Sequence, residues 1–557
     1  MPSLWRTFPL ISLLSSYIFV SLQPGWTRSQ FVGTFVATWA LQVFFYGLWS
    51  LVLYPKLFSP LIGLPEPKGG SFFMGHFASI RAKPTGIPMR EWADTIPNDG
   101  IIRYLAAFNR ERLLILGSKA LAEVLVTRNY DFQKPSAIRG GLSRLLGVGI
   151  LLAEGDEHKL QRKNLMPAFA FRHVKGLYSI FWNKGREVVE AMTNDIIASA
   201  QSGSSIQDPE KAKKTAVIEV GGWASRVTLD IIGLSGFGKD FGAIQNPNDG
   251  LNETYRRVFK ASKQAQRLTF LRNFLPDWII SRIPVKRNND IAGAAKTIRS
   301  VCRKLIREKK EKLERKELKD RDILSVALES GGFTEENLVD QLMTFLAAGH
   351  ETTATAMTWA VYMLCKFPEV QTRLRAEIRE NLPSIGSNQE VNNNDIDRLP
   401  YLNAVIHEVL RYYAPVPMTL REAAVDTVIQ GHKVPKGTAI MLSPWATNYD
   451  KKLWGPDAHE FNPDRWMPKG PDDKRAASGG ASSNYAFLTF LHGPRSCIGL
   501  AFAKAEFACL LATWIGRFEF ALQNEEDGIE KNMLIKGGIT ARPEKGMHVY
   551  TTVVDGW

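Results

Sequence analysis

The segment that most narrows what this chain can fold into is Phe490–Gly499, with the sequence FLHGPRSCIG. It places Cys497 directly before an apolar stretch, 500–515, that is predicted to be a helix. Free N–H groups at a helix start favour a thiolate, and Arg495 adds positive charge two residues away. The glycines of the segment permit a tight loop and the close approach of a flat ligand. A soft thiolate without companion ligands suits iron better than zinc.

The composition is that of a globular protein. Of 557 residues, 45% are hydrophobic and 23% are charged, which excludes disordered, collagen-like and coiled-coil classes. The chain is long enough to bury a large core without a disulfide or a metal. Its cysteines are too few and scattered for a disulfide framework and form no CxxC pair, so a reducing compartment is expected. They are Cys302, Cys365, Cys497 and Cys509.

The net charge of +14 indicates an acidic partner, an anionic membrane surface or nucleic acid. The sequence has no helix-turn-helix, zinc-finger or RNA-binding signature. We therefore expect a membrane or an acidic protein partner, and no nucleic acid.

The N-terminal region is predicted to be a membrane anchor. Residues 31–54 run for 24 positions without a charge, enough to cross a bilayer core as a transmembrane helix. Upstream, 8–22 is also uncharged but short and interrupted by Pro9, so it could be a signal-peptide core, a second short span or an interfacial segment. No small-residue cleavage site is clear, which favours an uncleaved anchor with one or two spans. The predicted division is an apolar segment and loop at 1–30, the span at 31–54, a proline- and glycine-rich neck at 55–70 and a catalytic domain at 71–557.

Helical periodicity dominates beyond the neck. The patterns at 334–365 and 402–412 predict helices, and short strands are expected at 112–116, 427–430 and 549–554. The expected fold class is mainly α with small β-sheets. An apolar segment at 274–280, flanked by arginines and a lysine, could be either a core helix or a segment that dips into the lipid interface.

The cysteine segment matches the pattern FxxGxRxCxG at Phe490, Gly493, Arg495, Cys497 and Gly499. In this the chain resembles the cytochrome P450 family over about 64–554. The resemblance implies a P450 fold that binds haem b with Cys497 as the axial thiolate. It also implies that the other four residues contribute to the haem site.

A second motif, AGHETT at 348–353, lies in the middle of the long predicted helix. Gly349 would let the helix widen, and Thr352 can bond to a carbonyl or to water. An acid beside a hydroxyl, as in Glu351 and Thr352, is what proton delivery to dioxygen requires. The motif resembles the oxygen-activation segment of the family.

A third motif places Glu408 and Arg411 three residues apart on one helix face, and Arg465 follows in FNPDRW. The resemblance implies that these three form a buried ion-pair triad with a structural role. Removal of one member would leave a buried charge uncompensated.

Further cations match residues that bind the haem propionates in the family. His158 and Arg162 fit the WxxxR helix, with histidine in place of the usual tryptophan, which puts the contact of residue 158 in doubt. Arg421 matches a further propionate-binding arginine. Arginine pairs well with carboxylates.

The resemblance implies a haem-thiolate monooxygenase that inserts one oxygen atom of O2 into a lipophilic small molecule and reduces the other to water. Since no flavin domain is present in the sequence, electrons would come from a separate NADPH–cytochrome P450 reductase. The expected location is the endoplasmic reticulum membrane, with the catalytic domain facing the cytosol. The pattern is most similar to filamentous-fungal enzymes that make terpenoid, polyketide or alkaloid secondary metabolites.

Other readings of the resemblance are a fatty-acid or xenobiotic hydroxylase, a haem-thiolate isomerase or dehydratase, and a non-catalytic haem-binding membrane protein. The intact Glu351–Thr352 pair argues against the last two. By position, the substrate would contact a loop at 138–152 and five apolar or small side chains. These are Phe345, Ala348, Val416, Met418 and Ile539.

Overall fold

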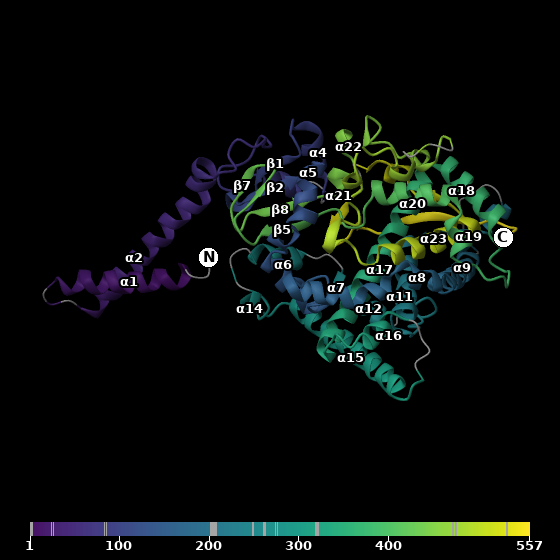
Figure 1. The fold of residues 1–557 in the computed structure, drawn as a ribbon, viewed down its shortest axis with the longest axis horizontal. Helices are drawn as coiled ribbons and strands as arrows, with labels where there is room; N and C mark the ends of the chain where they lie inside the picture. Colours follow the sequence, from purple (N-terminus) through teal and green to yellow (C-terminus); the bar gives the residue numbers. More distant parts are fainter. Residues whose placement is uncertain are drawn as a thin grey trace.

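The computed structural model has an elongated N-terminal helical hairpin that projects from a large, mainly helical body (Figure 1). It describes the chain except for residues 1–3, 24, 26, 83, 85, 201–208, 248–249, 260–262, 273–274, 276, 318–321, 471–472, 474–475, 531–532 and 538. Two residues of the apolar segment 274–280, positions 274 and 276, fall outside the described part.

The helices of the anchor and of the first half of the body are α1 (Leu4–Ser21), α2 (Arg28–Leu48), the π-helix η1 (Trp49–Phe58), α3 (Phe77–Ala82), α4 (Ile87–Thr95), α5 (Ser118–Ala122), α6 (Ser136–Leu146), α7 (Gly155–Phe169), α8 (Phe171–Val174), α9 (Tyr178–Ala200), α10 (Pro209–Ala212), α11 (Val220–Phe237), α12 (Gly250–Phe259), α13 (Lys263–Leu271) and α14 (Asp277–Ile280). Those of the second half are α15 (Lys286–Glu314), α16 (Ile323–Glu329), α17 (Glu335–Lys366), α18 (Pro368–Asn381), α19 (Asn393–Asp397), α20 (Pro400–Tyr412), α21 (Pro444–Thr447), α22 (Lys451–Trp454), the 3₁₀ turn η9 (Gly493–Arg495) and α23 (Leu500–Arg517).

The strands form small sheets. The largest has the order β1-β2-β8-β5-β3, in which only the β2–β8 pair is parallel. A second sheet has the order β4-β12-β9, and two hairpins pair β10 with β11 and β6 with β7. The bounds are β1 Ile101–Leu105, β2 Glu111–Ile115, β3 Phe132–Gln133, β4 Thr215–Glu219, β5 Thr419–Ala423, β6 Thr427–Ile429, β7 His432–Val434, β8 Ala439–Leu442, β9 Phe518–Leu522, β10 Ile535–Gly537, β11 Ala541–Pro543 and β12 His548–Val553.

Helix α17 runs through the core, and most of its side chains are buried. Its start is fixed by Thr334, whose hydroxyl accepts a hydrogen bond from the Asn337 amide, and by two glutamates in the first turn. It ends at Lys366 because Pro368 follows two residues later and disfavours helical backbone at the preceding Phe367, which has φ −124° and ψ 73°. Helices α11, α15 and α23 pack against it. These contacts hold the middle of α17 in a fixed place inside the body.

The end of the anchor is fastened to the body. The Asn109 side-chain amide donates to the backbone carbonyls of Leu51 in η1 (2.8 Å) and Phe72 (2.7 Å). The buried Arg103 guanidinium contacts the Pro55 carbonyl and forms an ion pair with Glu66. The predicted neck at 55–70 is therefore packed onto the body, with Leu61 fully buried.

The fold class is confirmed: the body is mainly helical with small sheets. The helix expected at 334–365 is α17, and the helix expected at 402–412 is the greater part of α20. The expectation of a loop at 138–152 is wrong over its first half. Residues 136–146 form α6 because Pro135 is compatible with a helix start and leucines recur with helical spacing.

Candidate functional site

The cysteine segment folds as a tight loop that includes the turn η9 and leads into α23. The Cys497 amide donates to the Phe490 carbonyl (2.8 Å), which closes the loop. Gly493 has φ +73°, and a Cβ atom there would overlap the Leu125 carbonyl oxygen, so the loop requires glycine at this position. Gly499 precedes the first turn of α23 and accepts from the Ala503 amide (2.8 Å). The Cys497 side chain is exposed, although it lies at the start of a mostly buried helix.

The charge beside the thiol comes from Arg162 rather than from Arg495. Arg162 on α7 donates to the Ser496 carbonyl (2.7 Å) and to the Ser496 hydroxyl (3.2 Å). Surrounding protein raises the pKa of Cys497, while the Gly499 N–H and the Arg162 charge oppose that rise. The expectation that Arg495 supplies this charge is not met, because its guanidinium turns toward Asn129, Phe132 and Glu154.

Four cationic side chains converge near His158 on α7: Lys134, Arg162, Arg421 and Arg495. His158 is buried, and its Nδ1 lies 3.3 Å from the Tyr130 hydroxyl. Burial, reinforced by the four cations, lowers the pKa of His158 to about 4, so this imidazole is neutral at pH 7. Four of the predicted haem-site residues, His158, Arg162, Arg421 and Arg495, are thus brought into one cluster, together with Lys134.

This cluster, which we call the cation cradle (Lys134, Arg162, Arg421 and Arg495), contains more positive charge than its neighbours compensate. Glu154 is the carboxylate that pairs with Arg495 and acts on Lys134 and Arg421. Burial and Arg421 lower the pKa of Lys134 to about 7. Burial and Arg495 lower that of Arg421 to about 10. The buried Arg495 Nε has no hydrogen-bond partner within the described residues.

A dianionic ligand would relieve this repulsion, because buried charges are stable only when they are paired. The exposed Cys497 thiol and the cation cradle are joined through Arg162. Together they offer a soft metal ligand next to a site for carboxylates, and the donor set therefore fits a haem, which has one iron and two propionates.

The middle of α17 borders open space at one face. Ala348 is exposed and Thr352, one turn later, is half-buried, whereas Phe345 and Ala347 are buried. The Phe169 ring at the end of α7 contacts the Phe345 ring, with centroids 5.4 Å apart. The same ring lies 3.8 Å from where a Cβ on Gly499 would be. Phe169 thus connects the cysteine loop with this part of α17.

Gly349 has a different role from the one expected. The helix is regular α-helix from Glu335 to Lys366. A Cβ at Gly349 would lie 2.9 Å from two atoms of the Ile232 side chain on α11. The glycine therefore allows two helices to pack closely and does not widen α17.

The two residues expected to deliver protons have different surroundings. The Thr352 hydroxyl donates to the Ala348 carbonyl (2.9 Å) in the half-open face of the helix. The Glu351 carboxylate is buried and accepts from the Thr540 hydroxyl (3.1 Å). It also forms an ion pair with Arg542 on β11 (3.2 Å). Glu351 is thus held by the C-terminal hairpin β10–β11.

The structure brings Glu408, Arg411 and Arg465 together in the core. Arg411 donates two hydrogen bonds of 2.8 Å to Glu408, and Arg465 donates a third at 3.1 Å. Trp466 and the Asn462 amide complete the shell of the carboxylate. Burial alone would raise the pKa of Glu408, but Arg411 and its hydrogen bonds hold it below its usual range. Glu408 and Arg411 are both fully buried.

The predicted substrate contacts are dispersed. Val416 follows Pro415, whose carbonyl accepts from the Ala541 amide (2.9 Å), two residues beyond Ile539. These two segments therefore lie together, near Glu351. Met418 packs instead into a separate apolar cluster around β1 and β2.

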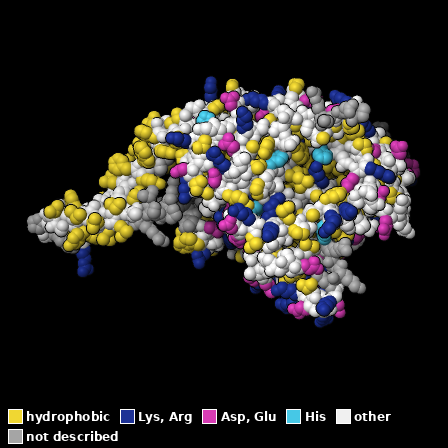
Figure 2. All heavy atoms as spheres, viewed as in Figure 1, with side chains coloured by type: hydrophobic (Ala, Val, Ile, Leu, Met, Phe, Trp, Pro, Cys, Tyr) yellow, Lys and Arg dark blue, Asp and Glu magenta, His cyan; other side chains and the backbone are white. Residues whose placement is uncertain are grey.

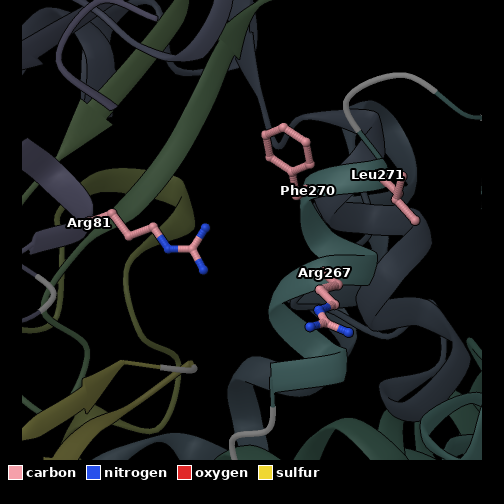
Figure 3. Close-up of a pocket in the computed structure, with 4 residues that line it drawn as sticks. All are labelled: Arg81, Arg267, Phe270 and Leu271. Carbon is pink, nitrogen blue, oxygen red and sulfur yellow. The ribbon is translucent and has the colours of Figure 1, made fainter. Parts of the chain in front are cut away.

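An opening of about 280 Å³ lies elsewhere, between α3 and α13. It is lined by Arg81, Arg267, Phe270 and Leu271, and in Figure 3 the Arg81 guanidinium extends across the gap toward α13. None of these residues was expected from the sequence to contact substrate.

Reasoning from the sequence did not identify Lys134, Glu154 or Arg542. Glu154 directly precedes α7 but pairs with Arg495, whereas Lys134 and Arg542 reach the site from other segments of the chain. The resemblance to the WxxxR helix, which pointed to Arg162, carries no information on such long-range pairs.

The cytochrome P450 family model matches residues 65–549. The chain is 47% identical over 516 residues to cytochrome P450 monooxygenase sphH of Aspergillus fumigatus, which covers 92% of this chain and 91% of that protein. It is 43% identical to cytochrome P450 monooxygenase ALT8 of Alternaria alternata, with 92% of each chain covered. It is 44% identical to cytochrome P450 monooxygenase FUM15 of Gibberella moniliformis, with 90% of each chain covered.

Proposed function

The chain belongs to the cytochrome P450 family of haem-thiolate monooxygenases, and on that basis we propose that it oxidises a lipophilic intermediate of secondary-metabolite biosynthesis. The single observation that carries the site assignment is the exposed Cys497 thiol, linked by Arg162 to the cation cradle. Cys497 binds the haem iron in this proposal, and the cation cradle and His158 bind the propionates. When bound, the haem supplies the iron at which O2 is activated, and thiolate ligation favours O–O cleavage.

In this proposal, Glu351 and Thr352 of α17 transfer protons within the site. Because the Thr352 hydroxyl donates its hydrogen to the Ala348 carbonyl, its oxygen lone pairs are free to accept a hydrogen bond from water. Glu351 is one residue away and is the nearest acid in the motif. A proton taken up at the Glu351 carboxylate would pass to water held at the Thr352 oxygen. Arg542 and Thr540 orient Glu351 for this transfer.

The substrate is proposed to lie along the half-open face of α17 at Ala348. Phe345, Val416, Met418 and Ile539 remain proposed contacts. The apolar character of these side chains supports a lipophilic substrate such as a terpenoid, polyketide or alkaloid. A fatty acid or a xenobiotic is also lipophilic, so a screen of candidate substrates should include both as alternatives.

Electrons are proposed to come from NADPH–cytochrome P450 reductase. Between His158 and Arg186 the sequence has no Asp or Glu. Exposed Lys163 is next to Arg162, which contacts Ser496 of the cysteine loop. Exposed Arg172 and Lys175 follow Phe169, whose ring lies beside Gly499. This basic surface supports docking of an acidic flavoprotein. The apolar helix Arg28–Phe58 supports anchoring in the endoplasmic reticulum membrane with the body in the cytosol.

The test uses microsomes from a heterologous host that express the full chain. The reduced wild type is expected to give the red-shifted Soret band of a thiolate-ligated haem with CO, and Cys497→Ser is expected to lose it. Cys365→Ser, at a cysteine outside the site, is the matched control and should retain the band. A wild-type band in Cys497→Ser would overturn the ligand assignment.

A second measurement tests the reaction. Substrate oxidation should require both NADPH and the reductase and should consume O2. Product formed without NADPH would instead identify an isomerase or dehydratase. Haem binding without turnover of any lipophilic substrate would favour a non-catalytic haem protein.

A further inference from the structure

The N-terminal hairpin has its polar groups inside and its apolar groups outside. Ser12 and Ser16 of α1 are fully buried against α2. The Gln42 amide donates to the Ser12 hydroxyl (3.1 Å), and the Ser16 and Thr38 hydroxyls lie 3.4 Å apart. The rings of Phe8 and Tyr46 meet edge to face at 5.5 Å. We call Ser12, Ser16, Thr38 and Gln42 the polar seam.

The outer surface of the same hairpin is almost entirely apolar. Figure 2 shows hydrophobic side chains covering it, in contrast to the mixed charges of the body. In water, a surface of this extent would be a strong liability. The large hydrophobic side chains exposed on α1 and α2 are Leu10, Ile11, Leu13, Leu14, Tyr17, Ile18, Phe19, Val32, Val36, Leu41, Phe44, Phe45 and Leu48.

This arrangement is the one that stabilises helix pairs in lipid. Between membrane helices there is no hydrophobic driving force, so small side chains and interhelical hydrogen bonds at the contact hold the pair together. A helix lying on the membrane surface would instead direct its polar side chains toward water. The serines of α1 point toward α2, and its apolar side chains face outward on the remaining sides.

The geometry also fixes where the two ends of the hairpin lie. The apolar part of α1, Thr7–Ser21, spans about 22 Å at 1.5 Å per residue, which is shorter than a hydrocarbon core of about 30 Å, and local thinning of the bilayer would accommodate the difference. The contact of Phe8 with Tyr46 shows that α1 runs antiparallel to α2 and begins beside its C-terminal part. In Figure 1 the described N-terminal end lies toward the body, and the turn between the helices is at the far tip.

We propose that α1 and α2 cross the membrane as a two-span hairpin, with the N-terminus on the same side as the catalytic body. Residues 22–27 would then be exposed on the opposite side. The inference rests on the membrane anchoring proposed above. The charges agree with it: Arg6, Lys56 and Lys68 would lie on the catalytic side and Arg28 alone at the turn.

Glycosylation mapping of the full chain in microsomes tests this topology. One form carries an Asn-X-Thr acceptor tag ahead of Met1, and a second carries the same tag, on a flexible linker, between Leu22 and Thr27. The hairpin predicts glycosylation of the second form only, with the body open to protease in sealed microsomes. Glycosylation of both forms would overturn the hairpin in favour of a single span through α2, because the N-terminus and residues 22–27 would then lie on the same side, opposite the body. Glycosylation of the N-terminal form only would also overturn it. Glycosylation of neither form would show that α1 does not cross, and would also overturn it.

Carbonate extraction separates this failure from failure of the anchor itself. If the chain stays in the membrane pellet but the tags report a single span, only the hairpin is wrong. If carbonate releases the chain, the proposed anchoring is wrong as well.

A crosslink tests the pairing directly. Ser16→Cys with Thr38→Cys should form a disulfide under oxidation in membranes, because the two hydroxyl oxygens lie 3.4 Å apart. A protease site engineered at 22–27 makes the crosslink visible, since it keeps the α1 fragment attached to the body after cleavage. Tyr17→Cys with Thr38→Cys is the matched control, because Tyr17 is 63% exposed and faces outward. Equal crosslinking in both pairs, or none in either, would overturn the packing on which the hairpin rests.

Discussion

The guanidinium of Arg542 lies 3.2 Å from the carboxylate of Glu351, which ties the edge of a C-terminal hairpin to the middle of the longest helix. The carboxylate is buried and the arginine is about one-third exposed. The ion pair thus extends from the interior of the enzyme toward solvent. We propose this edge as the route by which a proton reaches Glu351, with Arg542 orienting the carboxylate and carrying no proton itself.

Replacement of Arg542 tests that route. Arg542→Gln should lower the fraction of NADPH consumption that yields product by about tenfold, a part of the roughly 10²–10⁴-fold that general acid–base catalysis contributes. Arg542→Lys should recover part of the loss, and the solvent isotope effect on turnover should rise in the glutamine variant. Lys545→Gln, an exposed change beyond the same strand, is the control. Unchanged coupling and isotope effect in Arg542→Gln would contradict the route.

The triad around Glu408 should be intolerant of single changes. Arg411→Ala leaves a fully buried carboxylate with less compensation and is expected to lower the free energy of unfolding by about 3–5 kcal/mol. Arg411→Lys should not restore it, because lysine cannot donate the bidentate pair. Thermal unfolding in detergent measures the effect. Arg398→Ala, at an exposed arginine, should change stability by less than about 0.5 kcal/mol.

Glu506 on α23 predicts a pH dependence of stability. Its two carboxylate oxygens are buried with no cation among the described residues beside them to compensate a charge, and burial raises its pKa well above the usual value although the Thr353 hydroxyl acts in the opposite direction. The folded chain therefore holds a proton that the unfolded chain releases above about pH 4.5. Stability from this group is full below that pH and falls by up to about 1.4 kcal/mol per pH unit as pH rises.

Glu506→Gln removes this slope. The variant should become more stable relative to the wild type as pH increases from 5 to 8, as followed by thermal unfolding at each pH. Glu525→Gln, at an exposed acid, should leave the slope in place. Parallel curves for the wild type and Glu506→Gln would show that this glutamate is ionised in the folded chain.

The cysteine loop should tolerate no side chain at position 493. Gly493→Ala combines an unfavourable positive φ with overlap against the Leu125 carbonyl, and it should abolish the CO-bound thiolate spectrum. Gly431→Ala shares the positive φ, at +82°, but meets open space, so it isolates the backbone penalty of about 1–2 kcal/mol. A normal spectrum in Gly493→Ala would mean that the loop can rearrange.

Neutralising Lys134 should have opposite effects on the empty and the loaded protein. Without a dianionic ligand, Lys134→Gln removes repulsion from Arg421 and should raise the melting temperature. With haem bound, the same change removes a propionate partner and should speed haem transfer to apomyoglobin several-fold. Lys175→Gln, at an exposed lysine, is the control for both. If Lys134→Gln stabilised the haem-free protein and also slowed haem loss, or impaired both, Lys134 would not be a propionate partner.

Local motifs in the sequence predicted a large part of the site. The spacing of Glu408 and Arg411 and the position of Cys497 before an apolar helix are properties of single segments, and the structure has both the ion pair and the helix. Arg495 shows the limit of such reasoning. Its nearness in sequence to Cys497 suggested a charge for the thiol, but the turn at η9 directs the guanidinium toward Glu154. Arg162, from another helix, is the charge beside Cys497.

Contacts between segments that are remote in the chain could not be predicted from the sequence. Arg542 reaches Glu351 only because β11 lies beside the Pro415 backbone and α17, an arrangement set by tertiary packing. Gly349 is similar: its motif suggested a widened helix, whereas Ile232 of α11 occupies the space beside it. In both cases the deciding partner comes from a remote segment.

The hydrogen bonds of Asn109 to Leu51 and Phe72, with the contacts of Arg103 to Pro55 and Glu66, leave little freedom between anchor and body. A catalytic body on a loose tether would sample many tilts above a lipid surface. In the proposed membrane anchoring, the tilt of α1 and α2 would therefore set the tilt of the whole enzyme. A change in bilayer thickness would then act as a torque on the body and alter how often a partner diffusing in the same membrane meets the basic face beside Cys497 in a productive orientation.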